Sequence, residues 1–254
     1  MIEILKYSHN MGSQWDGFVQ ASKNGTIFHT RKFLSYHISR EFNDHSLCFK
    51  KKNKLIAVFP AAIIKENNQK ILFSHPGASF GGLVVHNNLS MNDLFYIIDK
   101  IEDNAKKNNI QEIRIIPTPL IYNHMHDESL LYGLKWKNYL EKEQYYSSII
   151  PINANIKNQC ELICKKNNRS HDFYDKIIKT NNLAICWDDG FDDFYSLLVK
   201  DKKKHGAIPT HSLKEIKNLK KIIPNSIKLL TIKKNTQILG GSLLFIANSS
   251  TAII

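Results

Sequence analysis

The chain has 254 residues, of which 43% are hydrophobic and 23% charged, and its formal net charge is +12. This size allows either one large globular domain or two of ordinary size. No apolar run is long enough for a membrane-spanning helix. Four cysteines are too few for a disulfide scaffold in a chain of this length. The first residues lack a secretory leader pattern, so a cytoplasmic location is expected. The basic surface suits phosphate-bearing partners, or it is an ordinary solvated surface in a chain rich in Lys, Asn and Ile.

The first part of the chain predicts helices and antiparallel strands. Residues 2–7 alternate as a strand does, and Ser13 can cap a helix that stops before Asn24 and Gly25. Turn-like Lys and Asn segments separate the strands between 46 and 73, which favours a meander. The further expected elements are a helix over 31–40, strands over 46–50, 55–64 and 70–73, a helix over 90–108, a strand over 111–116, a short helix near 127–132, and strands over 135–140 and 145–152.

After Pro151 the order of helices and then strands begins again. The expected elements are a long helix over 157–179, a strand over 184–187, helices over 189–202 and from Ser212, a hairpin of 227–232 with 237–246, and a strand over 251–254. We therefore predict an α+β fold with two domains, 1–152 and 153–254, each a mostly antiparallel sheet flanked by helices. Because no turn or cap follows the strand at 251–254, the second domain is expected to be incomplete at its C-terminus.

Residues 74–82, here called the glycine loop, contain three of the eleven glycines and lie between two apolar runs. Glycine permits positive φ and close approach of another chain or a ligand, so Gly77, Gly81 and Gly82 should show one or the other. In one interpretation His75, Ser79 and the free backbone N–H groups form the floor of a site that can hold an anion. In the other the loop is a packed turn, with His75 bonded to a backbone carbonyl. Ser79 is not predicted as a nucleophile, because no Gly-x-Ser-x-Gly elbow surrounds it.

Two histidines in the second part are candidate general bases. His205 and His211 flank a short segment with Gly206 and Pro209, and an imidazole that titrates near neutrality can take a proton from an amine. The alternatives are a cation at a helix C-terminus for His205 and a helix-entry residue for His211. Tyr145 is expected either to line the cleft between the two domains or to pack in an aromatic core. No metal site is predicted, because the Cys and His spacings do not match a ligand set.

Three groups of residues resemble one family in their order along the chain. They are 15–19 with 25–30, 59–61 with the glycine loop, and 204–206 with 209–212 and 238–245. Together they resemble the tandem GNAT (Gcn5-related N-acetyltransferase) domains of FemAB-like proteins. The resemblance spans most of the chain, although each group alone is weakly specific.

The resemblance implies an N-acyltransferase that transfers an acetyl or aminoacyl group to an amino group of an amino sugar, a nucleotide- or lipid-linked sugar, or a cell-envelope precursor. No tightly bound cofactor is implied; acetyl-CoA or another acyl donor, aminoacyl-tRNA among them, would be a co-substrate. His211 and His205 are the candidate catalytic residues. The candidate acceptor-binding residues are His75, Gly77, Ser79, Phe80, Gly81, Gly82 and Tyr145.

The chain departs from the family in one respect. No Gln/Arg-x-x-Gly-x-Gly/Ala segment, which wraps the coenzyme A pyrophosphate in acetyl-CoA-using members, occurs in the sequence. No residue of this chain is therefore assigned to coenzyme A. A non-catalytic binding module with the same fold is the alternative, and an RNA-associated protein with salt-dependent binding is a third.

Overall fold

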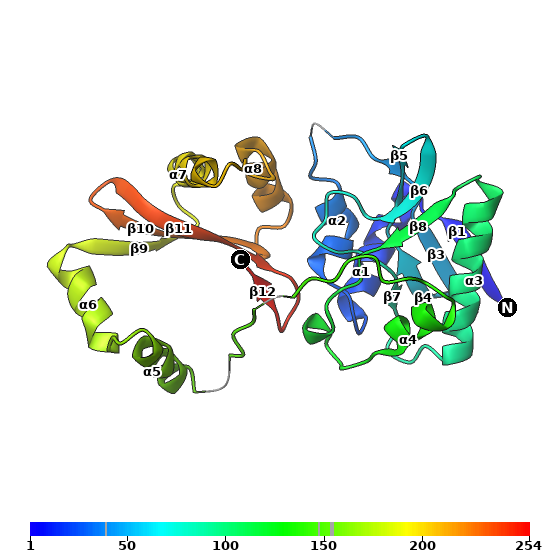
Figure 1. The fold of residues 1–254 in the computed structure, drawn as a ribbon, viewed down its shortest axis with the longest axis horizontal. Coiled ribbons are helices and arrows are strands. Elements are labelled where there is room, and N and C mark those ends of the chain that lie inside the picture. The colour runs from blue at the N-terminus through cyan, green and yellow to red at the C-terminus, as the bar shows by residue number, and fades with distance from the viewer. Residues whose placement is uncertain (39, 147, 153–154) are drawn as a thin grey trace. The chain divides into compact units, whose positions relative to one another are not determined.

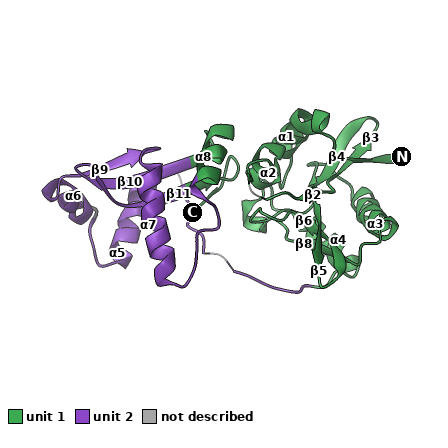
Figure 2. Ribbon diagram, turned by 90° about the horizontal axis from the view of Figure 1, so that it is seen from above, with its two compact units in different colours: residues 1–140, 214–227, 244–254 green, residues 141–213, 228–243 purple. Residues whose placement is uncertain are grey.

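The computed structural model describes residues 1–38, 40–146, 148–152 and 155–254. Packing divides the chain into two compact units, which Figure 2 colours separately. Unit 1 comprises residues 1–140, 214–227 and 244–254, and unit 2 comprises 141–213 and 228–243. Two later segments, 214–227 and 244–254, group with the first part of the chain, and the expected domains 1–152 and 153–254 stay a prediction. Each unit is described by itself.

Unit 1 contains most of the regular elements (Figure 1). Its helices are α1 (Gly12–Ala21), α2 (Arg31–Leu34), α3 (Met91–Lys107), α4 (Ser129–Trp136) and nearly all of α8 (Leu213–Ile222). Its strands are β1 (Ile2–Lys6), β2 (Asn43–Asp44), β3 (Leu47–Lys51), β4 (Lys54–Phe59), β5 (Ala62–Glu66), β6 (Gln69–Ser74), β7 (Val84–Val85), β8 (Glu112–Ile115) and β12 (Ala252–Ile253).

Two sheets form the framework of unit 1. The first has the order β1-β3-β4-β7 and is antiparallel throughout. The second has the order β2-β5-β6-β8, in which β6 and β8 run parallel and the other pairs are antiparallel. The parallel pair matters for the site, because it ends with Ser74 opposite Ile115, at the start of the glycine loop.

Helix α3 illustrates why the sequence folds as it does. The Ser90 hydroxyl accepts a hydrogen bond from the Asp93 backbone N–H at 3.2 Å, which caps the first turn. Apolar residues then recur every three or four positions and are all buried, as expected from the periodicity: Leu94, Ile97, Ile98 and Ile101. They join a core that includes Leu47, Phe59 and Leu72 of the sheets.

Unit 2 holds α5 (Ile156–Lys166), α6 (His171–Thr180), α7 (Phe191–Lys204), β9 (Leu183–Trp187) and most of β10 (Ile227–Lys234) and β11 (Gln237–Ile246). Strands β9 and β10 pair antiparallel, with Trp187 opposite Leu230 and Ile185 opposite Ile232. The side chain of Phe194 on α7 lies over Gly241 of β11, where an added Cβ would be 2.9 Å from the ring.

The predicted α+β class with helix-flanked, mostly antiparallel sheets is confirmed. The helix near 13–21, the capped helix after Ser90 and the hairpin at 227–246 are confirmed with small shifts at their ends. No helix among the described residues is both long and apolar enough to cross a membrane.

Two strand predictions in the first part are wrong. The strand expected over 55–64 is broken into β4 and β5, which lie in different sheets, so the meander is not continuous. Pro60 stands between them, and proline has no N–H to donate to a ladder. The pair expected at 135–140 and 145–152 does not form: Lys135 and Trp136 end α4, and the described residues of 137–152 lie in no strand.

Two helix predictions are also wrong in length. The helix over 31–40 is only α2, which ends where the Ser35 hydroxyl donates to the Lys32 carbonyl. The helix over 157–179 is two helices, because Asn168 adopts a φ of +53° after α5 and Ser170 caps α6 by accepting from the Phe173 N–H.

Candidate functional site

The glycine loop connects β6 to β7 and lies along the segment that follows β8. The Gly81 N–H donates to the Ile116 carbonyl at 2.8 Å, and Gly81 forms a parallel bridge with Pro117. Near the start of the loop, the Ser74 hydroxyl accepts from the Ile116 N–H at 2.9 Å. The loop is therefore held at both ends by one strand-like segment, and it continues the parallel pairing of β6 with β8.

The predicted backbone geometry of the loop glycines, positive φ or close approach, is confirmed. Gly77 and Gly82 have φ of +87° and +89°, in the region that favours glycine. A Cβ added to Gly81 would lie 2.6 Å from the Ser74 carbonyl oxygen, which is too close for any other residue. A Cβ at Gly77 would lie 2.4 Å from Nε2 of His37. Each glycine is thus required by positive φ, by close approach, or by both.

His29 fastens the C-terminal end of the loop. Its Nε2 lies 2.9 Å from the Gly81 carbonyl oxygen, which can only accept, so Nε2 carries the hydrogen. Its Nδ1 lies 2.9 Å from the Thr26 hydroxyl and accepts from the Thr26 N–H at 3.2 Å. Burial lowers the pKa of His29 to about 4, so the ring is neutral near pH 7. These contacts give His29 a structural role.

His75 lies inside the loop rather than on its surface. Its residue is 3% exposed, and Nδ1 lies 2.7 Å from the Pro76 carbonyl oxygen. Burial lowers the pKa of His75 to about 4. This geometry matches the packed-turn interpretation. The assignment of His75 to the acceptor stays a prediction, and a contact through the buried ring would require the loop to open.

The other candidate acceptor residues lie in different environments. Ser79 is exposed at the surface of the loop, whereas Phe80 is 7% exposed. The Phe80 ring packs edge-on against Phe28 with centroids 4.8 Å apart. Tyr145 is 84% exposed and hydrogen-bonds to the nearby Glu143 carboxylate. The structure thus brings Phe80 into an aromatic cluster and leaves Ser79 and Tyr145 open to solvent.

The two candidate bases lie in unit 2. His205 follows the last turn of α7 and is exposed, next to Gly206 with a φ of +65°. His211 is half-buried, and its backbone carbonyl accepts from the Tyr195 hydroxyl at 3.2 Å. The Tyr195 bond fixes the backbone of the segment that carries His211, and the role of its imidazole as a base stays a prediction.

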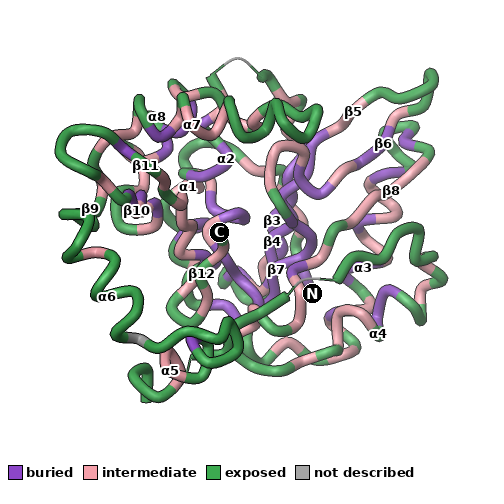
Figure 3. Tube along the Cα trace, turned by 60° about the vertical axis from the view of Figure 1, so that its left-hand side comes forward, coloured by how far each residue is buried: buried purple, intermediate pink, exposed green. Residues whose placement is uncertain are grey.

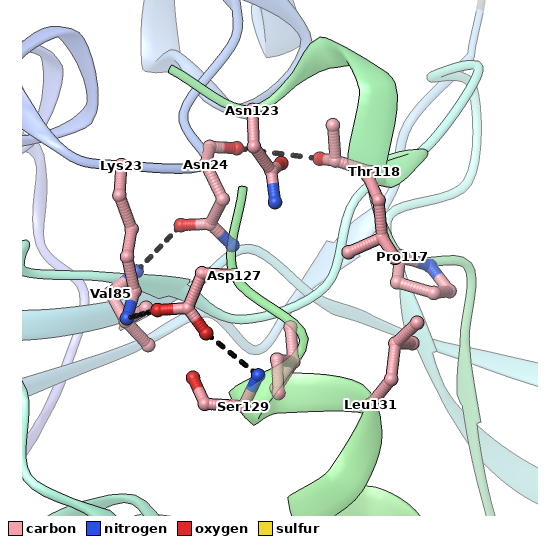
Figure 4. A pocket seen from close by; sticks show the side chains of 11 residues that line it. Lys23, Asn24, Val85, Pro117, Thr118, Asn123, Asp127, Ser129 and Leu131 are labelled. Atoms are coloured by element: carbon pink, nitrogen blue, oxygen red, sulfur yellow. Dashed lines mark hydrogen bonds and ion pairs between the residues drawn. The ribbon is translucent and has the colours of Figure 1, made fainter. Parts of the chain in front are cut away.

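A small cavity near the glycine loop contains polar residues that sequence reasoning missed (Figure 4). Buried Lys23 forms an ion pair with Asp127, and Asn24 donates to the Leu83 carbonyl at 2.8 Å. Burial alone would raise the pKa of Asp127, but hydrogen bonds from Lys23 and Ser129 hold it at about 2. No sequence signal joins Lys23 to Asp127, because 104 positions separate them.

The size of this cavity limits what it can hold. Its volume is about 10 Å³, which is the space of one water molecule. The Oδ1 atom of Asn123 is buried there and accepts no hydrogen bond from the residues that the structure describes, so a water molecule has an acceptor to bond. A sugar or an acyl chain does not fit, and the cavity is not an acceptor site.

Comparisons with known proteins show which solved structures share this fold. No family model matches the chain, and no curated protein matches it. The crystal structure of FemX aligns with 91% of this chain and 57% of the FemX chain, with a TM-score of 0.59 and 14% sequence identity. The chain has a FemX-like fold. The FemAB-like GNAT resemblance of the sequence is therefore confirmed at the level of the fold.

Two acetyltransferase structures are also similar to part of the chain. A ribosomal-protein-alanine N-acetyltransferase from Brucella melitensis biovar Abortus 2308 covers 59% of this chain and 100% of its own, with 10% identity and a TM-score of 0.41. An aminoglycoside acetyltransferase from an uncultured soil metagenomic sample covers 60% and 99%, with 10% identity and a TM-score of 0.40. This chain spans 57% of the FemX length.

Proposed function

We propose that the chain serves in N-acyl transfer, with an amino group of an amino sugar, a nucleotide- or lipid-linked sugar, or a cell-envelope precursor as the acceptor. The observation that supports this most directly is the FemX-like fold over 91% of the chain. In such a reaction the acceptor nitrogen attacks the acyl carbonyl, the donor leaves as a thiolate or an alkoxide, and the nitrogen loses one proton. The protein has to orient both substrates and accept that proton.

The described residues suggest how these roles divide. His211 is the first choice for the proton acceptor, because it is half-buried on a backbone segment fixed by Tyr195. His205, which is exposed, is the second choice. The exposed Ser79 is the side chain of the glycine loop best placed to meet an acceptor from solvent. His29 and His75 are unsuited to act as bases near pH 7, because both rings are buried and burial lowers the pKa of each to about 4.

A binding experiment followed by a transfer assay tests this proposal. UDP-glucosamine, a nucleotide-linked amino sugar, is titrated while amide NMR signals of the glycine loop are followed, with the helix α6 amides as the internal control. Acetyl-CoA is then added and release of free coenzyme A thiol is measured. Binding with thiol release supports the enzyme, and His211→Gln should abolish release without abolishing binding. Acceptor binding without release, for this and other acyl donors, supports the non-catalytic module instead.

A further inference from the structure

The side chain of His37, only 1% exposed, links two segments of unit 1 that are far apart in sequence. Its Nε2 lies 3.1 Å from the Gly77 carbonyl oxygen of the glycine loop. Its Nδ1 lies 3.6 Å from Oε1 of Glu215, in the first turn of α8. The ring occupies the space that a Cβ on Gly77 would need. One imidazole therefore contacts the loop on one side and α8 on the other.

The chemistry of these contacts constrains where hydrogens lie. The Gly77 carbonyl can only accept, so Nε2 carries a hydrogen. If His37 were neutral and Glu215 ionised, the lone pair of Nδ1 would face a carboxylate oxygen in a buried site. A proton on either atom turns this repulsion into attraction: an imidazolium beside a carboxylate, or a carboxylic acid beside a neutral imidazole.

The charged and titratable groups around His37 and Glu215 have opposing effects on the protonation of the pair. The Arg40 guanidinium lies 3.5 Å from the same oxygen of Glu215 and favours the ionised carboxylate. On balance the pKa of His37 is lowered: burial is the largest cause and Arg40 adds to it, whereas the Gly77 carbonyl and Glu215 oppose the change only in part. Burial raises the pKa of the adjacent Tyr36 phenol and lowers that of His75 to about 4, so both are neutral near pH 7.

We propose that the close pair His37–Glu215 carries one proton, on one side chain or the other, and that this proton makes the pair a latch between the glycine loop and α8. A second contact supports the docking of α8 here, because Asn218, one turn after Glu215, donates to the Tyr36 carbonyl at 3.2 Å. Removing the shared proton at higher pH restores the repulsion and releases the loop and α8 together. A second proton at low pH also opens the latch, because a cation at His37 then lacks its carboxylate.

If the proposed function holds, the latch affects it, because the two segments that the latch joins lie next to or contain the candidate site residues. Helix α8 begins two residues after His211, the first-choice base, and the glycine loop is the candidate acceptor element. A change in protonation of one buried pair would then alter the glycine loop and α8, the helix that follows the first-choice base along the chain. The latch itself requires no catalytic activity, so it can fail or hold independently of the transfer reaction.

Hydrogen exchange and NMR on the complete chain test the latch. Exchange of residues 74–82 and 213–222 is followed from pH 5 to 9 and corrected for the intrinsic rates of unstructured peptides. Both segments should lose protection together as the pH rises, by about tenfold, which corresponds to about 1.4 kcal/mol. The matched controls are His126→Gln and Glu128→Gln, because His126 and Glu128 form an exposed pair 4.0 Å apart.

Glu215→Gln separates the latch from simple packing. The Gln amide can donate to Nδ1 of a neutral His37, so this variant should keep both segments protected and remove the pH dependence. Nitrogen-detected NMR of His37 in the unaltered chain provides a test that requires no variant. A spectrum in which Nδ1 is unprotonated while the Glu215 carboxylate is ionised, at a pH where both segments are protected, overturns the proposal. Protection that varies no more with pH than in the control variants also overturns it.

Discussion

The two units differ in how they bury apolar side chains. Unit 1 contains two extended clusters of buried residues, around Leu72 and Ile97 and around Trp15, all nearly inaccessible to solvent. Among the described residues of unit 2, the buried apolar side chains are few: Cys164, Phe194, Leu229 and Ile238. In Figure 3 the strands β3, β4 and β7 are largely buried, whereas α5 and α6 are mostly exposed.

The difference is clearest in the sheets. On β9 and β10 the paired side chains Trp187, Ile185 and Ile232 are 58%, 54% and 39% exposed. Alternate residues of β10, Leu229 and Thr231, are fully buried. The sheet of unit 2 thus packs on one face only, whereas strands β3, β4 and β7 of unit 1 are largely buried. Cooperative stability should therefore come mainly from unit 1.

The largest contrast is expected from one substitution made in both units. Leu72→Ala on β6 removes a side chain that is fully buried in the core of unit 1, and should lower the unfolding free energy by about 2–5 kcal/mol. Leu239→Ala on β11, where Leu239 is 49% exposed, should cost less than about 1 kcal/mol. Urea unfolding measured by circular dichroism checks both. Equal losses in the two variants would contradict the assignment of the core to unit 1.

The buried histidines of unit 1 predict that stability falls in acid. The pKa of His29 is about 4 in the folded chain and about 6.5 when unfolded, and the same holds for His75. Below pH 6.5 the two histidines bind protons in the unfolded chain but stay neutral in the folded chain. The free energy of unfolding therefore decreases as the pH falls from 6.5 toward 4. The loss is on the order of 3 kcal/mol per histidine.

Unfolding at pH 7 and pH 4.5 measures this loss. His75→Gln should reduce the pH dependence, because it removes one of the two groups, whereas the exposed His205→Gln of unit 2 should leave it unchanged. An identical pH dependence in His75→Gln and the unaltered chain would show that His75 is not held neutral by burial.

Features of the fold that depend on a few neighbouring residues could be predicted from the sequence, whereas features that depend on distant segments could not. The capped helix after Ser90 and the loop glycines were predicted correctly, because a cap, a 3.6-residue period and positive φ are properties of a few neighbouring residues. The break at Pro60 was missed, although proline is itself a local signal. The strand expected over 145–152 has strand-forming residues, but a strand also needs a neighbour to pair with, and no local pattern supplies that.

The candidate site was less predictable for the same reason. The closeness of His37 to Gly77 and Glu215, and of Lys23 to Asp127, arises when segments 40 to 178 positions apart pack together. His75 attracted attention as a polar residue beside glycines, but its burial depends on Phe42 and the rest of the fold. Its neighbours, not its own position in the sequence, decide whether it can reach a ligand.

An intermediate effect is expected at the glycine loop. Gly77→Ala places a methyl group at a φ of +87° and 2.4 Å from His37 Nε2, so it should destabilise the chain by about 1–3 kcal/mol. The control is Gly17→Ala, in α1 of the same unit, where an added Cβ meets no atom within 4 Å. That change should stabilise by about 0.5–1 kcal/mol, because alanine favours the helix. If Gly77→Ala left the unfolding free energy unchanged, the loop would be able to move away from His37 without loss of stability.

The smallest effects are expected at two equivalent helix caps. Ser90 caps α3 and Ser170 caps α6, each accepting from the backbone N–H three residues later at 3.2 Å. Loss of either hydroxyl should cost its helix about 1 kcal/mol. Because α3 packs through Ile97 and Ile98 into the core of unit 1, Ser90→Ala should lower global stability by that amount. Because α6 is largely exposed, Ser170→Ala should increase hydrogen exchange within α6 and leave the global midpoint unchanged. A shift of the global midpoint by Ser170→Ala would show that α6 belongs to the cooperative core.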